Sequence, residues 1–138
     1  MTPLDVTRKT TFDLSFLETL RKTNDHVGEF IYSFAQQYLG FFKATQHSEE
    51  AFMHDPTAIA ALCYPEIFTS SRRVWVRVET CSKLLRGATV CDLRPWEEHE
   101  MSSNPLNVNV YFDVNSGALL SHFKQAISNL PKSPTDRE

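Results

Sequence analysis

The stretch His54-Asp55-Pro56-Thr57-Ala58-Ile59-Ala60-Ala61-Leu62-Cys63 sets the fold of the middle of the chain. Asp is a favoured helix N-cap, and Pro56 suits the first helical position, where its missing N–H would have no partner. The apolar run that follows predicts a short helix buried on nearly all sides. Pro65 is expected to end it.

The same stretch places an imidazole beside a carboxylate at the start of that helix. In one interpretation, Asp55 is simply the helix cap and His54 is a loop residue. In the other, a carboxylate held rigidly at the helix start binds a hard cation, and the neighbouring histidine moves a proton. The local sequence leaves both interpretations open.

Upstream, the sequence predicts a long amphipathic helix that starts near Asn24, with Asn24 or Asp25 as its cap. Apolar side chains recur there with helical spacing: Val27, Phe30, Ile31, Phe34, Tyr38, Leu39 and Phe42. This stripe indicates core packing, and Tyr38, Phe41 and Phe42 are candidates to reach a ligand. Residues 3–7 are compatible with the end of a strand, and residues 43–53 with a polar loop.

Downstream, the apolar period changes from helical spacing to alternation. Val74, Val76 and Val78 alternate with polar or aromatic residues, and residues 89–93 can return as a hairpin beyond Gly87. Residues 106–114 alternate again, and residues 119–130 predict a final amphipathic helix capped by Asn115 or Ser116. We therefore expect one α/β or α+β domain over residues 1–130, followed by a disordered tail over residues 131–138.

Composition narrows the class of protein. The 138 residues are 41% hydrophobic and 22% charged, with a net charge of −3, as in ordinary globular domains. Because there is no basic stripe and no long apolar run, neither nucleic acid nor a membrane is an expected partner. The N-terminal residues do not resemble a signal peptide, and the three cysteines form no CxxC pair. These features favour a cytoplasmic location.

Four segments together resemble the inosine-uridine preferring nucleoside hydrolase family. They are Leu4-Asp5-Val6-Thr7, His54-Asp55-Pro56-Thr57-Ala58-Ile59-Ala60, Pro65-Glu66-Ile67-Phe68, and Val78-Glu79-Thr80 with the later run Leu85–Asp92. They occur in the family's order and at fitting spacing, and cover residues 4 to about 129. The resemblance implies an α/β fold: the C-terminal portion of an open-sheet hydrolase, with a β-hairpin, a further strand and three helices.

The resemblance also implies a reaction and a cofactor. Members of the family hydrolyse the N-glycosidic bond of ribonucleosides to ribose and free base, and hold one Ca²⁺ at the ribose and the attacking water. Asp55 matches a calcium ligand, and His54 matches the histidine that protonates the leaving base. Tyr38 and Phe42 are candidates for substrate binding. Whether the base is a purine or a pyrimidine is left open.

One feature of the family has no counterpart in this sequence. The Asp-x-Asp-x-x-x-Asp-Asp motif, which supplies most of the calcium ligands and the general base, is absent. Ca²⁺ takes about 6–8 oxygen ligands, and Asp55 alone supplies at most two. We therefore expect a truncated hydrolase that is inactive alone and binds Ca²⁺ only with ligands absent from this chain. The acidic run Glu97–Glu100 is more typical of an exposed loop than of a metal site.

Two alternatives remain. The chain could be a non-catalytic relative that acts as a binding or oligomerisation module, as a homo-oligomer or in association with a full-length relative. It could also be an unrelated small α+β binding domain in which His54 and Asp55 only start a helix. The histidines His26, His47 and His122 are expected to be structural or solvated.

Overall fold

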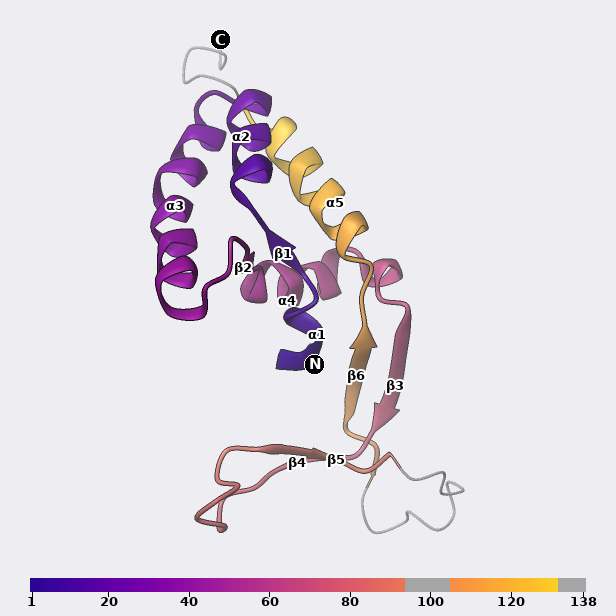
Figure 1. Cartoon of the computed structure of the whole chain (residues 1–138). Helices are drawn as coiled ribbons and strands as arrows, with labels where there is room; N and C mark the ends of the chain where they lie inside the picture. The colour runs from indigo at the N-terminus through magenta and orange to yellow at the C-terminus, as the bar shows by residue number, and fades with distance from the viewer. Residues whose placement is uncertain (94–104, 132–138) are drawn as a thin grey trace.

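The computed structural model describes residues 1–93 and 105–131. The helices α2 (Leu14–Thr23), α3 (Val27–Gln46) and α5 (Ser116–Ser128) gather at one end, and α4 (His54–Cys63) lies below them (Figure 1). The short helix α1 (Leu4–Thr7) lies beside α4. A ribbon of β3 (Ser70–Val74) and β6 (Val108–Asp113) leads away to the hairpin of β4 (Val76–Val78) and β5 (Thr89–Cys91).

The described strands form three separate antiparallel pairs: β1 (Thr11–Phe12) with β2 (Ala51–Phe52), β3 with β6, and β4 with β5. The predicted hairpin and further strand are therefore confirmed. The alternating run through Val74 and Val76 is divided at Trp75, where the chain changes strand partner. The side chain of Asn107 bonds both the N–H and the carbonyl of Val76, which fixes this change of partner.

Two apolar clusters form the core. One contains Val6, Met53, Ala60, Ile67, Phe68, Val114 and Leu119. The other contains Leu17, Leu20, Ala35 and Ile127 and lies where α2, α3 and α5 meet. Phe12 and Phe123 pack against both clusters. Because buried apolar area is the main favourable term in folding, these two rings tie the helical end to the region around α4.

The long predicted helix is confirmed as α3, and its approach to α2 is unusually close. The N-cap is His26 instead of Asn24 or Asp25, but the carboxamide oxygen of Asn24 still accepts from the N–H groups of His26 and Val27 at the helix start. A Cβ at Gly28 would overlap the carbonyl of Leu20. Glycine at this position therefore lets the two helices touch backbone to backbone.

Several local expectations were wrong. Residues 4–7 form helix α1 instead of a strand, with the N–H groups of Val6 and Thr7 bonded to the carbonyl of Pro3. Helix α2 was not foreseen, so the described residues hold five α-helices instead of three. The expected loop 43–53 is shorter, because α3 continues to Gln46 and residues 51–52 form β2.

Helix α4 also differs from its prediction. Its N-cap is Met53, and Asp55 lies in the first turn without a side-chain capping bond. Only one face is buried, since Ile59 is 60% exposed and Leu62 is 81% exposed. The helix ends at Cys63, ahead of the short 3-10 turn η1 (Pro65–Ile67), as Pro65 predicted.

The remaining expectations concern the C-terminal half. Strand β6 and helix α5 are confirmed, with the Asn115 side chain accepting from the N–H of Ala118. The acidic run at residues 97–100 and the tail at 132–138 lie outside the described residues. None of the helices in residues 1–93 and 105–131 is both long and apolar enough to cross a lipid bilayer.

Candidate active site at the start of helix α4

The start of α4 is fixed to the segment that carries α1 and β1. The N–H of Met53 donates to the carbonyl of Thr10 at 2.9 Å. The hydroxyls of Thr10 and Thr57 lie 2.6 Å apart and are fully buried, and Thr57 also donates to the carbonyl of Met53. Buried hydroxyls that are fully paired hold one geometry, so the residues next to Met53 have little freedom.

His54 is held on two sides. Its Nδ1 lies 2.7 Å from the hydroxyl oxygen of Thr7, and its ring packs at 5.3 Å on the ring of Phe52. Thr7 is only 4% exposed. Sequence reasoning assigned no role to Thr7. The one sequence feature that could have pointed to Thr7 is its position at the end of Leu4-Asp5-Val6-Thr7, the first of the four segments that resemble the family.

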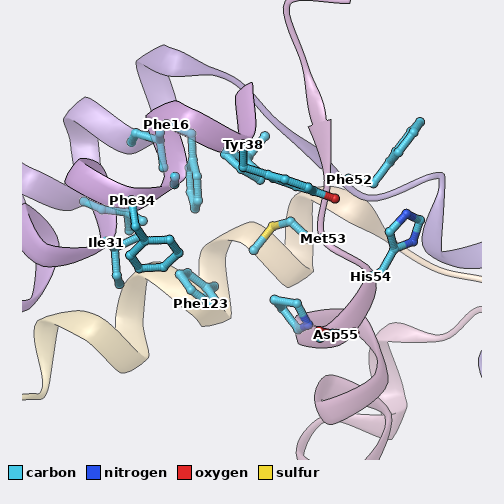
Figure 2. A pocket seen from close by; sticks show the side chains of 14 residues that line it. Phe16, Ile31, Phe34, Tyr38, Phe52, Met53, His54, Asp55 and Phe123 are labelled. Carbon is cyan, nitrogen blue, oxygen red and sulfur yellow. The ribbon is translucent and has the colours of Figure 1, made fainter. Parts of the chain in front are cut away.

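A cavity of about 380 Å³ opens beside His54 and Asp55. Figure 2 shows its wall of aromatic and apolar side chains from α2, α3, α5 and the start of α4. They include Phe16, Ile31, Phe34, Tyr38, Phe52, Met53 and Phe123. A largely apolar cavity with a few polar groups at one end is typical of a site for a small organic molecule.

Tyr38 belongs to the polar end of this cavity. Burial raises the pKa of its hydroxyl above the ordinary value, and the negative charge of Asp55 raises that pKa further. Its ring lies 6.3 Å from that of Phe12 and 5.0 Å from that of Phe42. The structure thus brings together Tyr38, His54 and Asp55, three of the four residues that the sequence assigns to catalysis, calcium binding or substrate binding.

Phe42, the fourth, is placed differently. It is 5% exposed and does not line the cavity. Its ring contacts the rings of Tyr38 and Phe52 at about right angles, at 5.0 and 5.3 Å. Phe42 therefore supports two cavity side chains from behind, and direct contact with substrate stays a prediction.

The described residues do not make a complete metal site. Among residues 1–93 and 105–131, no three His, Cys, Asp or Glu side chains group together as metal ligands would. Asp55 is exposed at the cavity mouth and is a suitable oxygen donor for calcium, but one carboxylate falls far short of a full coordination shell. Asp55 is thus the one carboxylate among the described residues that line this cavity.

The other described histidines do not line this cavity, although His122 lines a neighbouring one that shares Asp55 with it. The ring of His122 stacks on that of Tyr64 at 4.1 Å. His47 ends α3 with a φ of 53°, and His26 precedes the first turn of the same helix. That these three histidines have no role in catalysis stays a prediction.

The family model for inosine-uridine preferring nucleoside hydrolases matches residues 1–121 of the chain. The chain belongs to this family. Among curated nucleoside hydrolases, it is 30% identical over 130 residues to the pyrimidine-specific ribonucleoside hydrolase RihA of Photobacterium profundum. It is 36% identical over 121 residues to RihA of Salmonella gallinarum. These alignments cover 94% and 84% of the chain but only 40% and 36% of the relatives.

Solved nucleoside hydrolases share the fold. An inosine-guanosine nucleoside hydrolase superposes with a TM-score of 0.78 at 22% identity, over 92% of this chain and 38% of that one. A purine-preferring ribonucleoside hydrolase from Gardnerella vaginalis gives 0.77 at 22% identity, over 93% of this chain and 39% of that one. The expected α/β nucleoside-hydrolase fold is confirmed, and the chain spans about 40% of the length of these hydrolases.

Proposed function

We propose that this chain contributes the His54–Asp55 part of an active site that hydrolyses the N-glycosidic bond of ribonucleosides to ribose and free base. The observation that carries the proposal is the position of this pair. His54 and Asp55 lie at the polar end of an aromatic cavity, in a chain of the nucleoside hydrolase family. Tyr38 contributes to the wall that receives the base, and Phe42 supports that wall.

The chemistry of the pair suits the reaction. Departure of the base leaves an electron pair on its nitrogen, and a proton donor beside the base stabilises that charge. An imidazole titrates in the range where such a transfer is easy. Asp55 would be one ligand of a calcium ion that orients the ribose hydroxyls and a water molecule. Because Asp55 is one donor among the several that calcium requires, activity depends on the part of the hydrolase domain that this chain does not include.

The three cysteines support a cytoplasmic site for this activity. Cys63, Cys81 and Cys91 are all free thiols. Free thiols persist most readily in a reducing compartment.

A second candidate function is association with another protein. One side of α3 carries Phe30, Phe34 and Phe41, which are 67, 53 and 56% exposed. Ile59 and Leu62 are exposed on α4. Contiguous exposed apolar side chains are typical of interaction surfaces. The module would then bind a second copy of itself or a full-length hydrolase through this surface, without catalysis.

The deciding experiment joins this chain to the Asp-rich portion of a bacterial nucleoside hydrolase. Release of free base from uridine and from inosine is measured with calcium and with chelator. We expect His54→Ala and Asp55→Asn each to lower kcat/KM by at least about a hundredfold, the usual scale for a proton donor. The matched controls His47→Ala and Glu66→Gln, at exposed sites away from the cavity, should leave activity unchanged.

Each alternative has its own result. Unchanged activity in Asp55→Asn would refute the calcium-ligand role, and unchanged activity in His54→Ala would refute the proton donor. An inactive joined protein that folds, while the separate chain binds a full-length hydrolase, would favour the association module.

A further inference from the structure

The hydroxyl of Thr7 contacts both the ring of His54 and a backbone carbonyl. The oxygen Oγ1 of Thr7 lies 2.7 Å from Nδ1 of His54 and 3.3 Å from the carbonyl oxygen of Leu4, one helical turn earlier. Thr7 itself is 4% exposed, and both contacts are partly buried. The two segments are 47 positions apart in sequence.

Hydrogen counting decides the direction of these bonds. A threonine hydroxyl carries one hydrogen and accepts with its lone pairs, whereas the carbonyl of Leu4 can only accept. If the hydroxyl donated to Nδ1, the contact with the Leu4 carbonyl would hold no hydrogen. Both contacts are hydrogen bonds only when Nδ1–H donates to Oγ1 and Oγ1–H donates to the carbonyl. Bonds in such a chain strengthen one another.

We propose that Thr7 is a positioning residue that fixes neutral His54 as the Nδ1–H tautomer and leaves Nε2 as the atom that exchanges a proton with a bound molecule. The catalytic meaning of this assignment rests on the proposed function. The assignment of the tautomer does not depend on that function. The ring of Phe52 packs against the imidazole and limits its rotation, so Nε2 keeps one direction.

The assignment explains how one proton is transferred. In the doubly protonated ring, Nδ1–H stays bonded to Thr7 and Nε2–H faces the leaving base. As the N-glycosidic bond breaks, its electron pair stays on the base nitrogen, which takes the Nε2 proton, while ribose gains the hydroxyl of water. The remaining proton of that water passes to solvent, and solvent returns a proton to Nε2 before the next turnover. The ring that remains is the neutral Nδ1–H form that Thr7 binds. The bond from Nδ1–H to Thr7 is thus present before and after the transfer, so the proton that leaves is the one on Nε2.

The test reads the tautomer directly in this chain. Ring nitrogens with and without a proton differ widely in ¹⁵N chemical shift. A long-range ¹H–¹⁵N spectrum of the ¹⁵N-histidine-labelled protein, recorded at a pH where the imidazoles are neutral, therefore reports the tautomer of each ring. We expect His54 to be mainly Nδ1–H, unlike the exposed rings of His26 and His47.

Three variants separate the hydroxyl from the rest of Thr7. Thr7→Val keeps the shape but loses the acceptor, and should shift the His54 tautomer ratio about fivefold toward Nε2–H, the factor given by a hydrogen bond of about 1 kcal/mol. Thr7→Ser keeps the hydroxyl and should retain the wild-type ratio. Thr23→Val removes a hydroxyl that bonds only a helix carbonyl, and should change nothing at His54.

Two results would overturn the proposal: an Nε2–H ring in the wild-type protein, or an unchanged ratio in a folded Thr7→Val variant. If Thr7→Val fails to fold, the wild-type and Thr7→Ser spectra still decide it. In the joined hydrolase, Thr7→Val should lower kcat more than it raises KM, with rescue by serine. If His54→Ala proves fully active, the proposed function fails while the tautomer assignment stands on its spectrum.

Discussion

The side-chain amide of Asn24 donates to the backbone carbonyl of Ile127, 103 positions further along the chain. The same amide donates to the carbonyl of Leu130, while its oxygen caps α3 through His26 and Val27. Asn24 is almost completely buried. One side chain thus closes the first turn of α3 and the last turn of α5.

Asn24→Ala should therefore be among the more damaging single changes in this chain. It removes a helix cap worth about 1 kcal/mol and takes one hydrogen-bond donor from each of the carbonyls of Ile127 and Leu130, at about 1 kcal/mol each. We expect the free energy of unfolding to fall by about 2–4 kcal/mol in urea titration. Asn129→Ala, at the exposed end of α5, is the control and should change little. A loss below about 1 kcal/mol for Asn24→Ala would show that the two helix ends do not depend on it.

The two glycines of α3 should respond to alanine in opposite directions. At Gly28 a methyl group meets the backbone of Leu20 and Arg21, which cannot move aside, so Gly28→Ala should cost about 1–3 kcal/mol. At Gly40 nothing lies within 4 Å, so Gly40→Ala should gain about 0.5–1 kcal/mol from helix propensity. Thermal melts of both variants test the pair. Equal effects of either sign would contradict the close approach of α2 and α3.

Asp13 should make stability depend on acid pH. Its carboxylate accepts from the N–H of Phe16 and from the hydroxyl of Ser15, and these bonds lower its pKa. A carboxyl whose folded-state pKa lies below its unfolded value stabilises the fold above the unfolded value, and this contribution is lost as the pH falls through the folded value.

Asp13→Ala should therefore destabilise the protein by about 1 kcal/mol at neutral pH. The difference from wild type should shrink well below the ordinary Asp pKa of about 3.9. Urea midpoints across that range measure the effect. Glu18→Gln, which neutralises an exposed acid on the same helix, should leave the pH profile as in wild type. A pH-independent difference would mean that the charge of Asp13 plays no part in the cap.

The exposed side of α3 should govern association. Phe34→Lys interrupts the apolar surface of Phe30, Phe34 and Phe41 at its centre, so any self-association or binding to a full-length hydrolase should weaken. Gln36→Lys adds the same charge on another side of the helix and is the matched control. Sedimentation velocity over a range of concentrations measures the effect. Association that persists in Phe34→Lys but fails in Gln36→Lys would place the contact elsewhere.

The parts of the fold that sequence predicted are those with long, regular periodicity. In α3 the apolar residues follow helical spacing for about four turns, and β6 alternates regularly, so each pattern is long enough to identify its element. Helix α2 carries weaker signals, but Asp13 as cap and the spacing of Leu14, Leu17 and Leu20 were available. Helix α1 holds Val6 and Thr7, poor helix formers, and only its packing against α4 and β6 decides its form.

The candidate site was predictable to the same extent. His54 and Asp55 stand out as neighbouring ionisable residues at a helix start, and the matching segments gave them roles. The sequence did not indicate a role for Thr7, because its contact with His54 joins residues 47 positions apart and a single threonine forms no recognisable pattern. The start of α4 was misplaced by two residues, because the bond from Met53 to Thr10, another distant contact, sets it.

The pairing of β1 with β2 joins Thr11 to Phe52 and Phe12 to Ala51. The chain between these strands forms α2 and α3. It leaves the segments that hold His54 in place and then returns to them. Residues 7–12 and 51–57 hold His54 in place, whereas much of the cavity wall comes from α2 and α3. Changes in the length or aromatic content of the helical pair can therefore reshape what the cavity accepts without moving the histidine. Under the proposed function, substrate range and proton transfer are therefore set by different parts of the chain.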